Sequence, residues 1–171
     1  MSKLLSGEAC RKIDRELTKF PSDQKQSSVM AALAIAQQER GWLSPELMQE
    51  VADYLGMPAI AVQEVASFYN MFNIKPVGKH KITVCTNLPC GLSGGNAAAA
   101  HLQERLGIGF GETTTDGLFT LVPGECMGAC GDAPVLLVNN NRMCSCMTNE
   151  KIDAMLADLK QDALKQEEQK K

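Results

Sequence analysis

Apolar residues recur at three- and four-residue intervals through the first 67 residues, which is the spacing of amphipathic helices. Residues that stop or start helices divide this stretch into four segments. Pro21, Gly41 and Gly56 are expected to end the first three helices, while Ser44 caps the third and Pro58 starts the fourth. Four helices with short connections predict a bundle or an extended helical arm.

The helical period ends before residues 74–78, where a proline and a glycine mark a domain boundary. We therefore expect an α+β protein, with an N-terminal helical bundle over residues 1–73 and an α/β domain over 79–160. Residues 161–171 are dominated by Gln, Glu, Lys and Asp, which predicts a frayed or disordered charged tail. Four bulky residues within 68–72 predict either a core hinge between the domains or a buried contact with a partner subunit.

From Lys79 the pattern changes to the alternation of a half-buried strand. Ile82 and Val84 lie between polar neighbours, and this strand is expected to end at Cys85. The other elements expected in this half are a helix over 94–106 capped by Ser93, strands at 117–122, at 134–138 and from Arg142, and a helix from Thr148. The asparagines at 139–141 suit a tight hairpin between the last two strands. This order of elements forms a small α/β unit whose functional loops meet at one edge of the sheet.

Composition places the 171-residue chain among ordinary globular proteins, with 44% hydrophobic and 22% charged residues. No apolar run approaches the roughly 20 residues of a membrane helix, and the N-terminus lacks the apolar stretch of a secretory signal. A net charge of −3 without a basic cluster argues against nucleic acid as a partner. We therefore expect a cytoplasmic protein without direct membrane insertion, in which paired cysteines indicate metal or redox chemistry.

Four of the seven cysteines form two close pairs, Cys85 with Cys90 and Cys126 with Cys130. Both pairs follow expected strand ends, so the fold should bring the four thiols together at one edge of the sheet. Glycines surround both pairs and would let backbone N–H groups approach the sulfur atoms. The glycines with this expected role are Gly91, Gly94, Gly128 and Gly131.

Three kinds of site are compatible with grouped cysteines. A structural zinc ion agrees with the spacing, although the α/β unit has enough apolar residues to fold without a metal. Thioredoxin-type dithiol chemistry uses two cysteines separated by two residues, a spacing that the sequence lacks. A [2Fe-2S] cluster needs two thiolates on each iron, which two close pairs supply directly. Glu125 beside Cys126 would add negative charge and disfavour reduction of such a cluster.

Two motifs carry a family resemblance, Cys-Thr-Asn-Leu-Pro-Cys over 85–90 and Gly-Glu-Cys-Met-Gly-Ala-Cys-Gly-Asp-Ala-Pro over 124–134. They resemble the NuoE family, the thioredoxin-like two-iron ferredoxin subunits of bacterial complex I. Segments 38–43 and 65–69 resemble the helical N-terminal region of the same family. The resemblance covers nearly the whole chain, over residues 10–160.

This resemblance implies a thioredoxin-like C-terminal domain that binds one [2Fe-2S] cluster and contains no catalytic residue. The implied ligands are Cys85, Cys90, Cys126 and Cys130. It also implies a NuoF-type partner that holds FMN and the NADH site, further hydrophilic-arm subunits, and a place on the cytoplasmic side of the inner membrane. The chain would then carry single electrons within NADH:quinone oxidoreductase, while the isolated chain performs no substrate chemistry. The same module occurs in NAD-linked hydrogenases and NAD-dependent formate dehydrogenases, and a zinc-stapled interaction module is the rival without redox chemistry.

The remaining cysteines and the histidines have simpler expected roles. Alternation predicts Cys144 and Cys146 on one strand face as free buried thiols, with a disulfide or a redox-sensitive thiol as the alternative. Cys10 lies on the apolar stripe of the first helix and is expected in the core. His80 and His101 are the residues that would replace a cysteine in a mixed site, which four available thiols make unnecessary.

Overall fold

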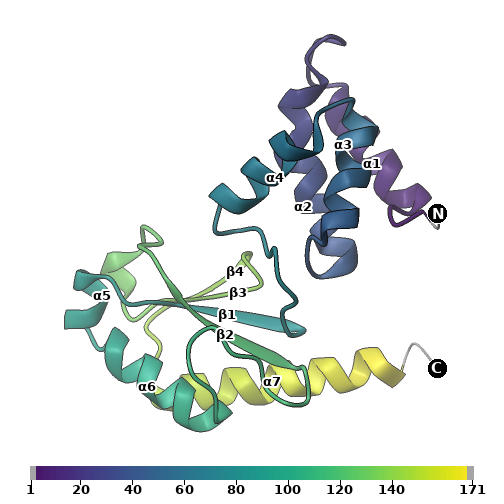
Figure 1. Ribbon diagram of the computed structural model, residues 1–171. Helices are drawn as coiled ribbons and strands as arrows, with labels where there is room; N and C mark the ends of the chain where they lie inside the picture. The colour runs from purple at the N-terminus through teal and green to yellow at the C-terminus, as the bar shows by residue number, and fades with distance from the viewer. Residues whose placement is uncertain (1–2, 169–171) are drawn as a thin grey trace. The chain divides into compact units, whose positions relative to one another are not determined.

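The computed structural model describes residues 3–168, and the chain divides into two compact units, Met1–Pro76 and Val77–Lys171 (Figure 1). Each unit has its own hydrophobic core. In the described residues the first unit is helical, and the second combines helices with a four-stranded sheet, which confirms the α+β class. Within residues 3–168, no helix is long and apolar enough to cross a membrane.

Four α-helices form the first unit. They are α1 (Gly7–Leu17), α2 (Val29–Arg40), α3 (Pro45–Leu55) and α4 (Ala59–Phe68), with the 3-10 turn η1 (Lys25–Ser28) before α2. Gly41, Ser44, Gly56 and Pro58 lie at helix ends as expected, but the first helix ends at Leu17, before the expected Pro21. Ser44 caps α3, because its hydroxyl accepts the Leu47 N–H at 3.2 Å. Gly41 and Gly56 follow α2 and α3 with positive φ angles of 84° and 68°, which confirms both as helix stops.

The apolar faces of these four helices share one core. Fully buried side chains come from every helix, namely Ile13, Leu33, Val51 and Val62. Cys10 is half-buried and packs against this core, which agrees with its expected role. Phe72 is buried in the same core, but Phe68 is 78% exposed. The predicted core hinge is therefore wrong for Phe68, which lies two residues after the buried Ala66 and so on another side of α4.

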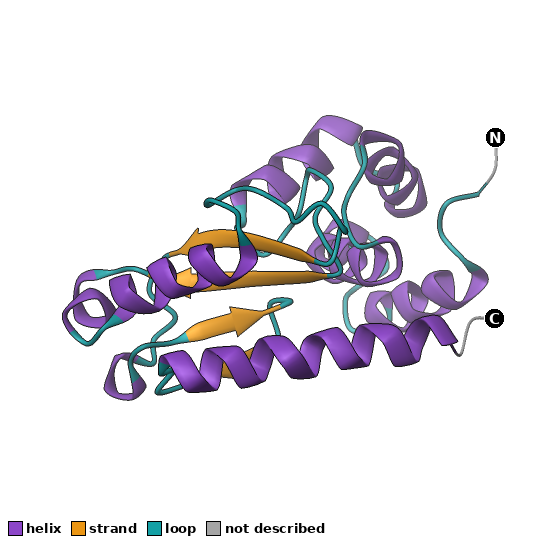
Figure 2. Cartoon of the chain, turned by 90° about the horizontal axis from the view of Figure 1, so that it is seen from below, coloured by secondary structure: helices purple, strands orange, loops and turns teal. Residues whose placement is uncertain are grey.

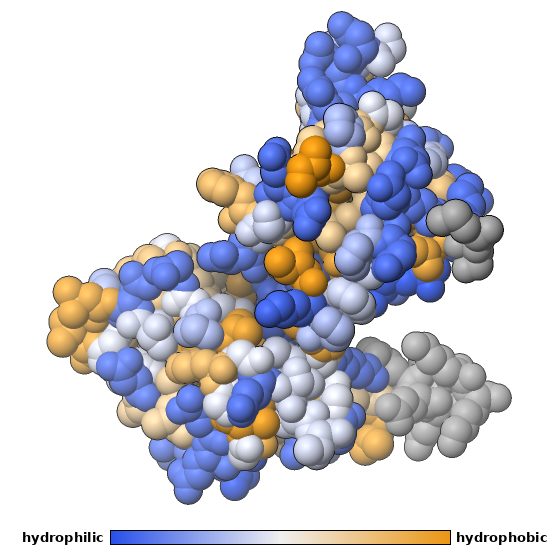
Figure 3. Space-filling model, in the orientation of Figure 1, coloured by the Kyte–Doolittle hydropathy of each residue, from blue (hydrophilic) through white to orange (hydrophobic). Residues whose placement is uncertain are grey.

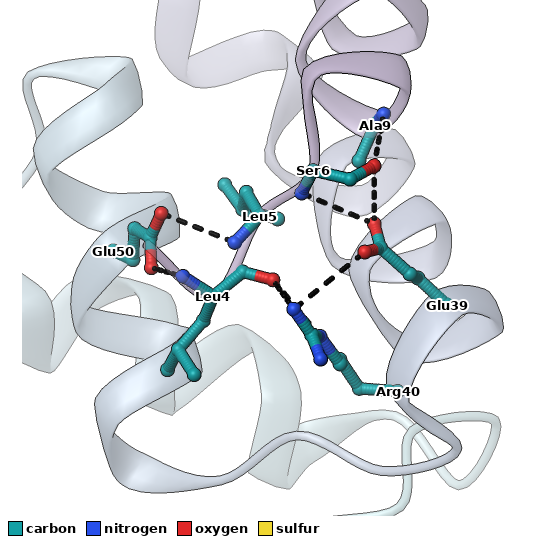
Figure 4. A network of polar contacts seen from close by, with 7 residues as sticks. All are labelled: Leu4, Leu5, Ser6, Ala9, Glu39, Arg40 and Glu50. Carbon is teal, nitrogen blue, oxygen red and sulfur yellow. Dashed lines mark hydrogen bonds and ion pairs between the residues drawn. The ribbon is translucent and has the colours of Figure 1, made fainter. Parts of the chain in front are cut away.

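A polar network ties the segment before α1 to α2 and α3 (Figure 4). The Glu50 carboxylate of α3 accepts the N–H of Leu4 at 2.7 Å and the N–H of the next residue at 3.1 Å. Arg40, the last residue of α2, donates to the Leu4 carbonyl. The Glu39 carboxylate accepts the Ser6 hydroxyl at 3.1 Å, and that hydroxyl also caps α1. These contacts fix the point at which α1 begins.

The second unit is built on a mixed sheet with strand order β2-β1-β3-β4 (Figures 1 and 2). Its strands are β1 (His80–Cys85), β2 (Phe119–Gly124), β3 (Leu136–Val138) and β4 (Arg142–Cys144). β1 runs parallel to β2 and antiparallel to β3, and Cys85 lies opposite Gly124 at the end of the parallel pair. Asn139 and Asn140 have positive φ angles in the β3–β4 turn, which confirms the predicted hairpin.

Two helices, α6 (Gly95–Leu106) and α7 (Asn149–Glu168), lie against one face of this sheet (Figure 1). Leu102 of α6 and Ile152 of α7 are fully buried and share a core with Ile82 and Leu121 from the central strands. This core holds β1 and β2 side by side, so it positions the loops that follow both strands.

The second unit contains one helix that was not expected, and several of its boundaries differ from those expected; β3, for example, begins at Leu136 and not at residue 134. A short helix, α5 (Leu88–Leu92), precedes α6, and the sequence pattern did not predict it. Gly94 rather than Ser93 is the N-cap of α6, and no side chain caps this helix. β2 begins at Phe119, two residues later than predicted, because the preceding residues form a turn whose Gly117 has a φ of 68°.

The C-terminal helix extends further than its composition predicts. α7 continues to Glu168, so the expected frayed tail is wrong for residues 161–168. Ala163 is buried, and its carbonyl accepts the Lys79 ammonium group at 3.0 Å. A helix that is already nucleated by packed turns adds residues at little cost. Residues 169–171 of the predicted tail lie outside the described part of the chain.

Candidate metal centre

The first cysteine pair lies where β1 passes into α5. Cys85 is the last residue of β1 and Cys90 lies in the middle of α5, and both are only 1% exposed. The Cys85 N–H donates to the Val135 carbonyl at 3.2 Å. These three residues form a small core of their own, against which Met127 and other residues of the second cysteine loop pack. The protein interior therefore holds the first two thiols.

The second cysteine pair lies in the loop that follows β2. Cys126 comes two residues after the end of β2, and Cys130 begins the 3-10 turn η2 (Cys130–Asp132). Their sulfur atoms are 3.6 Å apart, and both residues are exposed. Gly128 has a φ of 75°, and its N–H donates to the Cys126 sulfur at 3.4 Å. The loop thus presents two neighbouring thiols, with one backbone donor, toward the surface.

The two cysteine loops pack against each other, and charge interactions extend from one pair of thiols to the other. Burial raises the pKa of the Cys90 thiol, and a hydrogen bond and charge interaction with Cys85, together with the charge of Cys130, raise it further. The hydrogen bond and charge interaction with Cys126 raise the pKa of Cys130, and the charge of Cys85 adds to this effect. Each pair is therefore linked internally, and Cys130 interacts with both cysteines of the first pair.

A polar contact also links the two cysteine loops. The Asn87 side-chain amide donates to the Glu125 carboxylate at 2.8 Å. Beside it, the Thr86 N–H donates to the Gly124 carbonyl at 3.4 Å. Because Asn87 lies between the cysteines of the first pair and Glu125 precedes Cys126, this contact helps to fix the separation of the pairs. It also orients the Glu125 carboxylate, which the sequence suggested only as a nearby charge.

The glycines near the cysteines differ in whether the surrounding atoms leave room for a side chain. Gly128 supplies the backbone N–H expected of it. A Cβ on Gly91 would meet nothing closer than 3.5 Å, and a Cβ on Gly131 would meet nothing within 4 Å, so space alone does not require glycine there. The sequence places Gly95 and Gly124 near the pairs as well, but gives no reason for glycine at either; a Cβ there would lie within 3.0 Å of other atoms. Only the tertiary contacts identify these two.

The prediction for the later cysteines needs correction. Cys144 ends β4 and is half-buried, but Cys146 is exposed and has a φ of 52°. Alternation along one strand fails because the strand stops at Cys144. The Cys146 N–H instead donates to the Asp132 carbonyl at 2.7 Å, at the end of the η2 turn that begins with Cys130. Cys146 therefore lies beside the second cysteine loop as an exposed thiol.

The two histidines lie in other surroundings. His80 begins β1 and packs on the Phe119 ring, with ring centroids 5.8 Å apart. Burial lowers the pKa of His80, which favours its neutral form. The His101 ring lies 3.0 Å from the Asp153 carboxylate, in a contact between α6 and α7. Each histidine thus has a structural role in the core or at a helix contact.

The grouping of the thiols bears on the kind of metal centre they can hold. A structural zinc site needs four ligands around one point. Within residues 3–168, no three or more His, Cys, Asp or Glu side chains are grouped so as to hold a metal ion, so the choice between centres rests on the donor set and not on a preformed geometry. Two linked pairs match the donor set of a [2Fe-2S] cluster, in which each iron takes two thiolates. The residues present therefore fit such a cluster.

Comparison with known proteins gives a consistent result. The sequence model of the thioredoxin-like [2Fe-2S] ferredoxin family matches residues 13–160. NADH-quinone oxidoreductase subunit 2 of Thermus thermophilus is 38% identical over 148 residues, which are 86% of this chain and 82% of that protein. An NADH-quinone oxidoreductase subunit of Rickettsia bellii is 41% identical over 147 residues, which are 85% of this chain and 87% of that protein.

A solved structure resembles this chain as well. An NAD+-reducing [NiFe]-hydrogenase in the H2-reduced state aligns with a TM-score of 0.67 and 25% sequence identity. The alignment covers 78% of this chain, which spans only 22% of the hydrogenase chain. The module described here thus occurs in that structure as part of a longer polypeptide.

Proposed function

The chain belongs to the thioredoxin-like [2Fe-2S] ferredoxin family, and we propose that it is the electron-carrier subunit of an NADH:quinone oxidoreductase, complex I. The packing of the two cysteine loops against each other beside the ends of β1 and β2 carries this proposal: Met127 packs against the small core of Cys85 and Cys90, and Asn87 donates to Glu125. Its cofactor is one [2Fe-2S] cluster, and a bound cluster of this kind takes up and releases one electron at a time. The oxidoreductase activity belongs to the assembled complex, to which this chain contributes no substrate chemistry.

Each part of the site has a distinct role in this proposal. Cys85 and Cys90 hold one iron from the protein interior, and Cys126 and Cys130 hold the other from the exposed loop. The Gly128 N–H donates to sulfur and offsets part of the negative charge that four thiolates bring together. The packed small core around the first pair excludes water from one side of the cluster.

The asymmetric burial of the two pairs supports a partner on the side of the second loop. We propose that this partner is a NuoF-type subunit that holds FMN and the NADH site, within a hydrophilic arm on the cytoplasmic side of the inner membrane. α5 also exposes apolar surface, visible at the left of Figure 3, where Leu88 and Leu92 are 74% and 81% exposed. Because α5 contains Cys90, a subunit that covers this surface would come close to the cluster.

Anaerobic reconstitution of the full chain with ferrous iron and sulfide tests the cluster. We expect about two irons and two sulfides per chain, and an EPR signal after dithionite reduction. Cys90→Ser or Cys126→Ser should lose or distort this signal because each removes one of two thiolates on an iron. Cys146→Ser is the matched control and should preserve the signal. A colourless chain that contains zinc, or an unchanged signal in the first two variants, would refute the ligand assignment.

The likeness to an NAD+-reducing [NiFe]-hydrogenase favours one alternative, the equivalent subunit of an NAD-linked hydrogenase. Measurements on the isolated chain do not distinguish the two assemblies, so the test is to identify the subunits that copurify with it. Affinity purification of the tagged chain from its own cells, followed by mass spectrometry, distinguishes them. Complex I subunits with NADH-driven quinone reduction support the proposal, whereas a [NiFe] subunit with hydrogen-driven NAD+ reduction supports the alternative.

A further inference from the structure

The first turn of α6 lies directly against the main chain of both cysteines of the first pair. A Cβ atom on Gly95 would lie 2.7 Å from the Cys90 carbonyl oxygen and 2.9 Å from the Cys85 carbonyl oxygen. Real Cβ atoms essentially never approach other heavy atoms within 3.0 Å. Both neighbours are backbone atoms, so rotation of a side chain cannot relieve the overlap.

The requirement for glycine at this position is steric. Gly95 is buried, and it is absent from the glycines of this chain that have a positive φ angle. Any L-residue could therefore adopt its backbone conformation, but none could fit its Cβ. Gly91 is a useful contrast, because it directly follows Cys90 and yet its Cβ would be 3.5 Å from the nearest atom. Proximity to a cysteine in the sequence is thus not what makes Gly95 special.

We propose that Gly95 is a positioning residue, whose missing Cβ lets α6 set the separation between Cys85 and Cys90. The inference rests on the proposed function, since that separation matters only if the pair holds an iron. An alanine would have to open the 2.7 Å contact by about 0.7 Å to reach the 3.4 Å of ordinary contact. Functional groups need to be held within about 0.5 Å of their working geometry. A shift of this size, passed on to the cysteine main chain, exceeds what the site tolerates.

Substitution by alanine in the full chain tests this role, with Gly109→Ala in the same unit and Gly7→Ala in the first unit as matched controls, because a Cβ at either position would meet nothing closer than 3.4 Å. After reconstitution and challenge with a chelator, Gly95→Ala should retain about tenfold less cluster than wild type, with shifted EPR g values and reduction potential in what remains. Both controls should behave as wild type. In the metal-free chain, we expect faster alkylation of Cys90 in Gly95→Ala, measured by peptide mass spectrometry, because its shielding is disturbed.

The outcomes separate this inference from the proposed function. A wild-type chain that assembles no cluster contradicts the function itself. The role of Gly95 is overturned if the wild-type chain binds a cluster and Gly95→Ala matches the controls in chelator resistance, EPR and alkylation. If circular dichroism shows that Gly95→Ala is unfolded, the measurements are repeated in a stabilising osmolyte. A chain that stays unfolded there also counts against the inference, because glycine is then needed by the whole fold and not by the cysteine separation.

Discussion

Because each unit has its own hydrophobic core, a substitution in one core should change the urea midpoint of that unit by a predictable amount. Leu33 in α2 and Leu121 in β2 are each fully buried, one in each core. Truncation of a fully buried leucine to alanine costs about 3–5 kcal/mol, because apolar contacts are lost and a cavity remains. With a urea dependence of about 1–2 kcal/mol per molar for a unit of this size, either substitution should lower the midpoint of its own unit by roughly 1.5–5 M, or about 2.7 M at the middle of both ranges.

A natural probe reports on the first unit alone. Trp42 is the single tryptophan of the chain and lies in Met1–Pro76. Its fluorescence in the metal-free chain therefore follows unfolding of that unit, while far-UV circular dichroism follows both. We expect Leu33→Ala to shift the fluorescence midpoint and Leu121→Ala to leave it within about 0.3 M. Only Leu121→Ala should reduce cluster assembly, since its core positions the strands that carry the cysteines.

The opposite result would be informative about the fold. If Leu121→Ala moves the fluorescence midpoint as far as Leu33→Ala does, the chain unfolds as one cooperative unit. The separation of the cores would then have no energetic meaning. Our proposal of a helical domain over residues 1–73 and a separate cluster domain over 79–160 would be refuted with it.

Two further expectations concern assembly of the cluster. The pKa values of Cys90 and Cys130 are raised, so both thiols are protonated at neutral pH and must lose protons to bind iron. The yield of cluster reconstitution should therefore rise between about pH 6 and pH 9. A yield that stays flat or falls over this range contradicts the expectation. Asn87→Ala removes the contact with Glu125, which as an exposed contact is worth less than about 1 kcal/mol. We expect Asn87→Ala to lose its cluster to a chelator faster than wild type, with an unchanged urea midpoint. Asn141→Ala, at another exposed asparagine, is the control. Equal rates of cluster loss in the two variants would show that the contact between Asn87 and Glu125 does not hold the loops together.

Local signals in the sequence predicted those features that depend on neighbouring residues. The Ser44 cap and the Gly41 stop were recognised because capping is satisfied within one turn. The strand ending at Cys85 was recognised because alternation has a period of two. α5 was missed because five residues are too few to establish a helical period.

Long-range packing decided what local signals could not. Composition suggested disorder after Lys160, but burial of Ala163 keeps α7 helical there. Alternation suggested a buried Cys146, but the end of β4 and a hydrogen bond to the Asp132 carbonyl place it at the surface. Both errors have one cause, because the partner groups are distant in the sequence and no local pattern records them.

By itself, the sequence determined the α+β class, the four thiols and their grouping in two pairs, because residue type and spacing are sufficient for these conclusions. Only the tertiary structure decided that Cys130 interacts with both cysteines of the other pair, and that Asn87 joins their loops through Glu125. It alone showed that Gly95 has no room for a Cβ. Contacts of this kind depend on how α6 and the sheet pack in space. The spacing of residues along the chain does not give the distances between atoms that packing brings together.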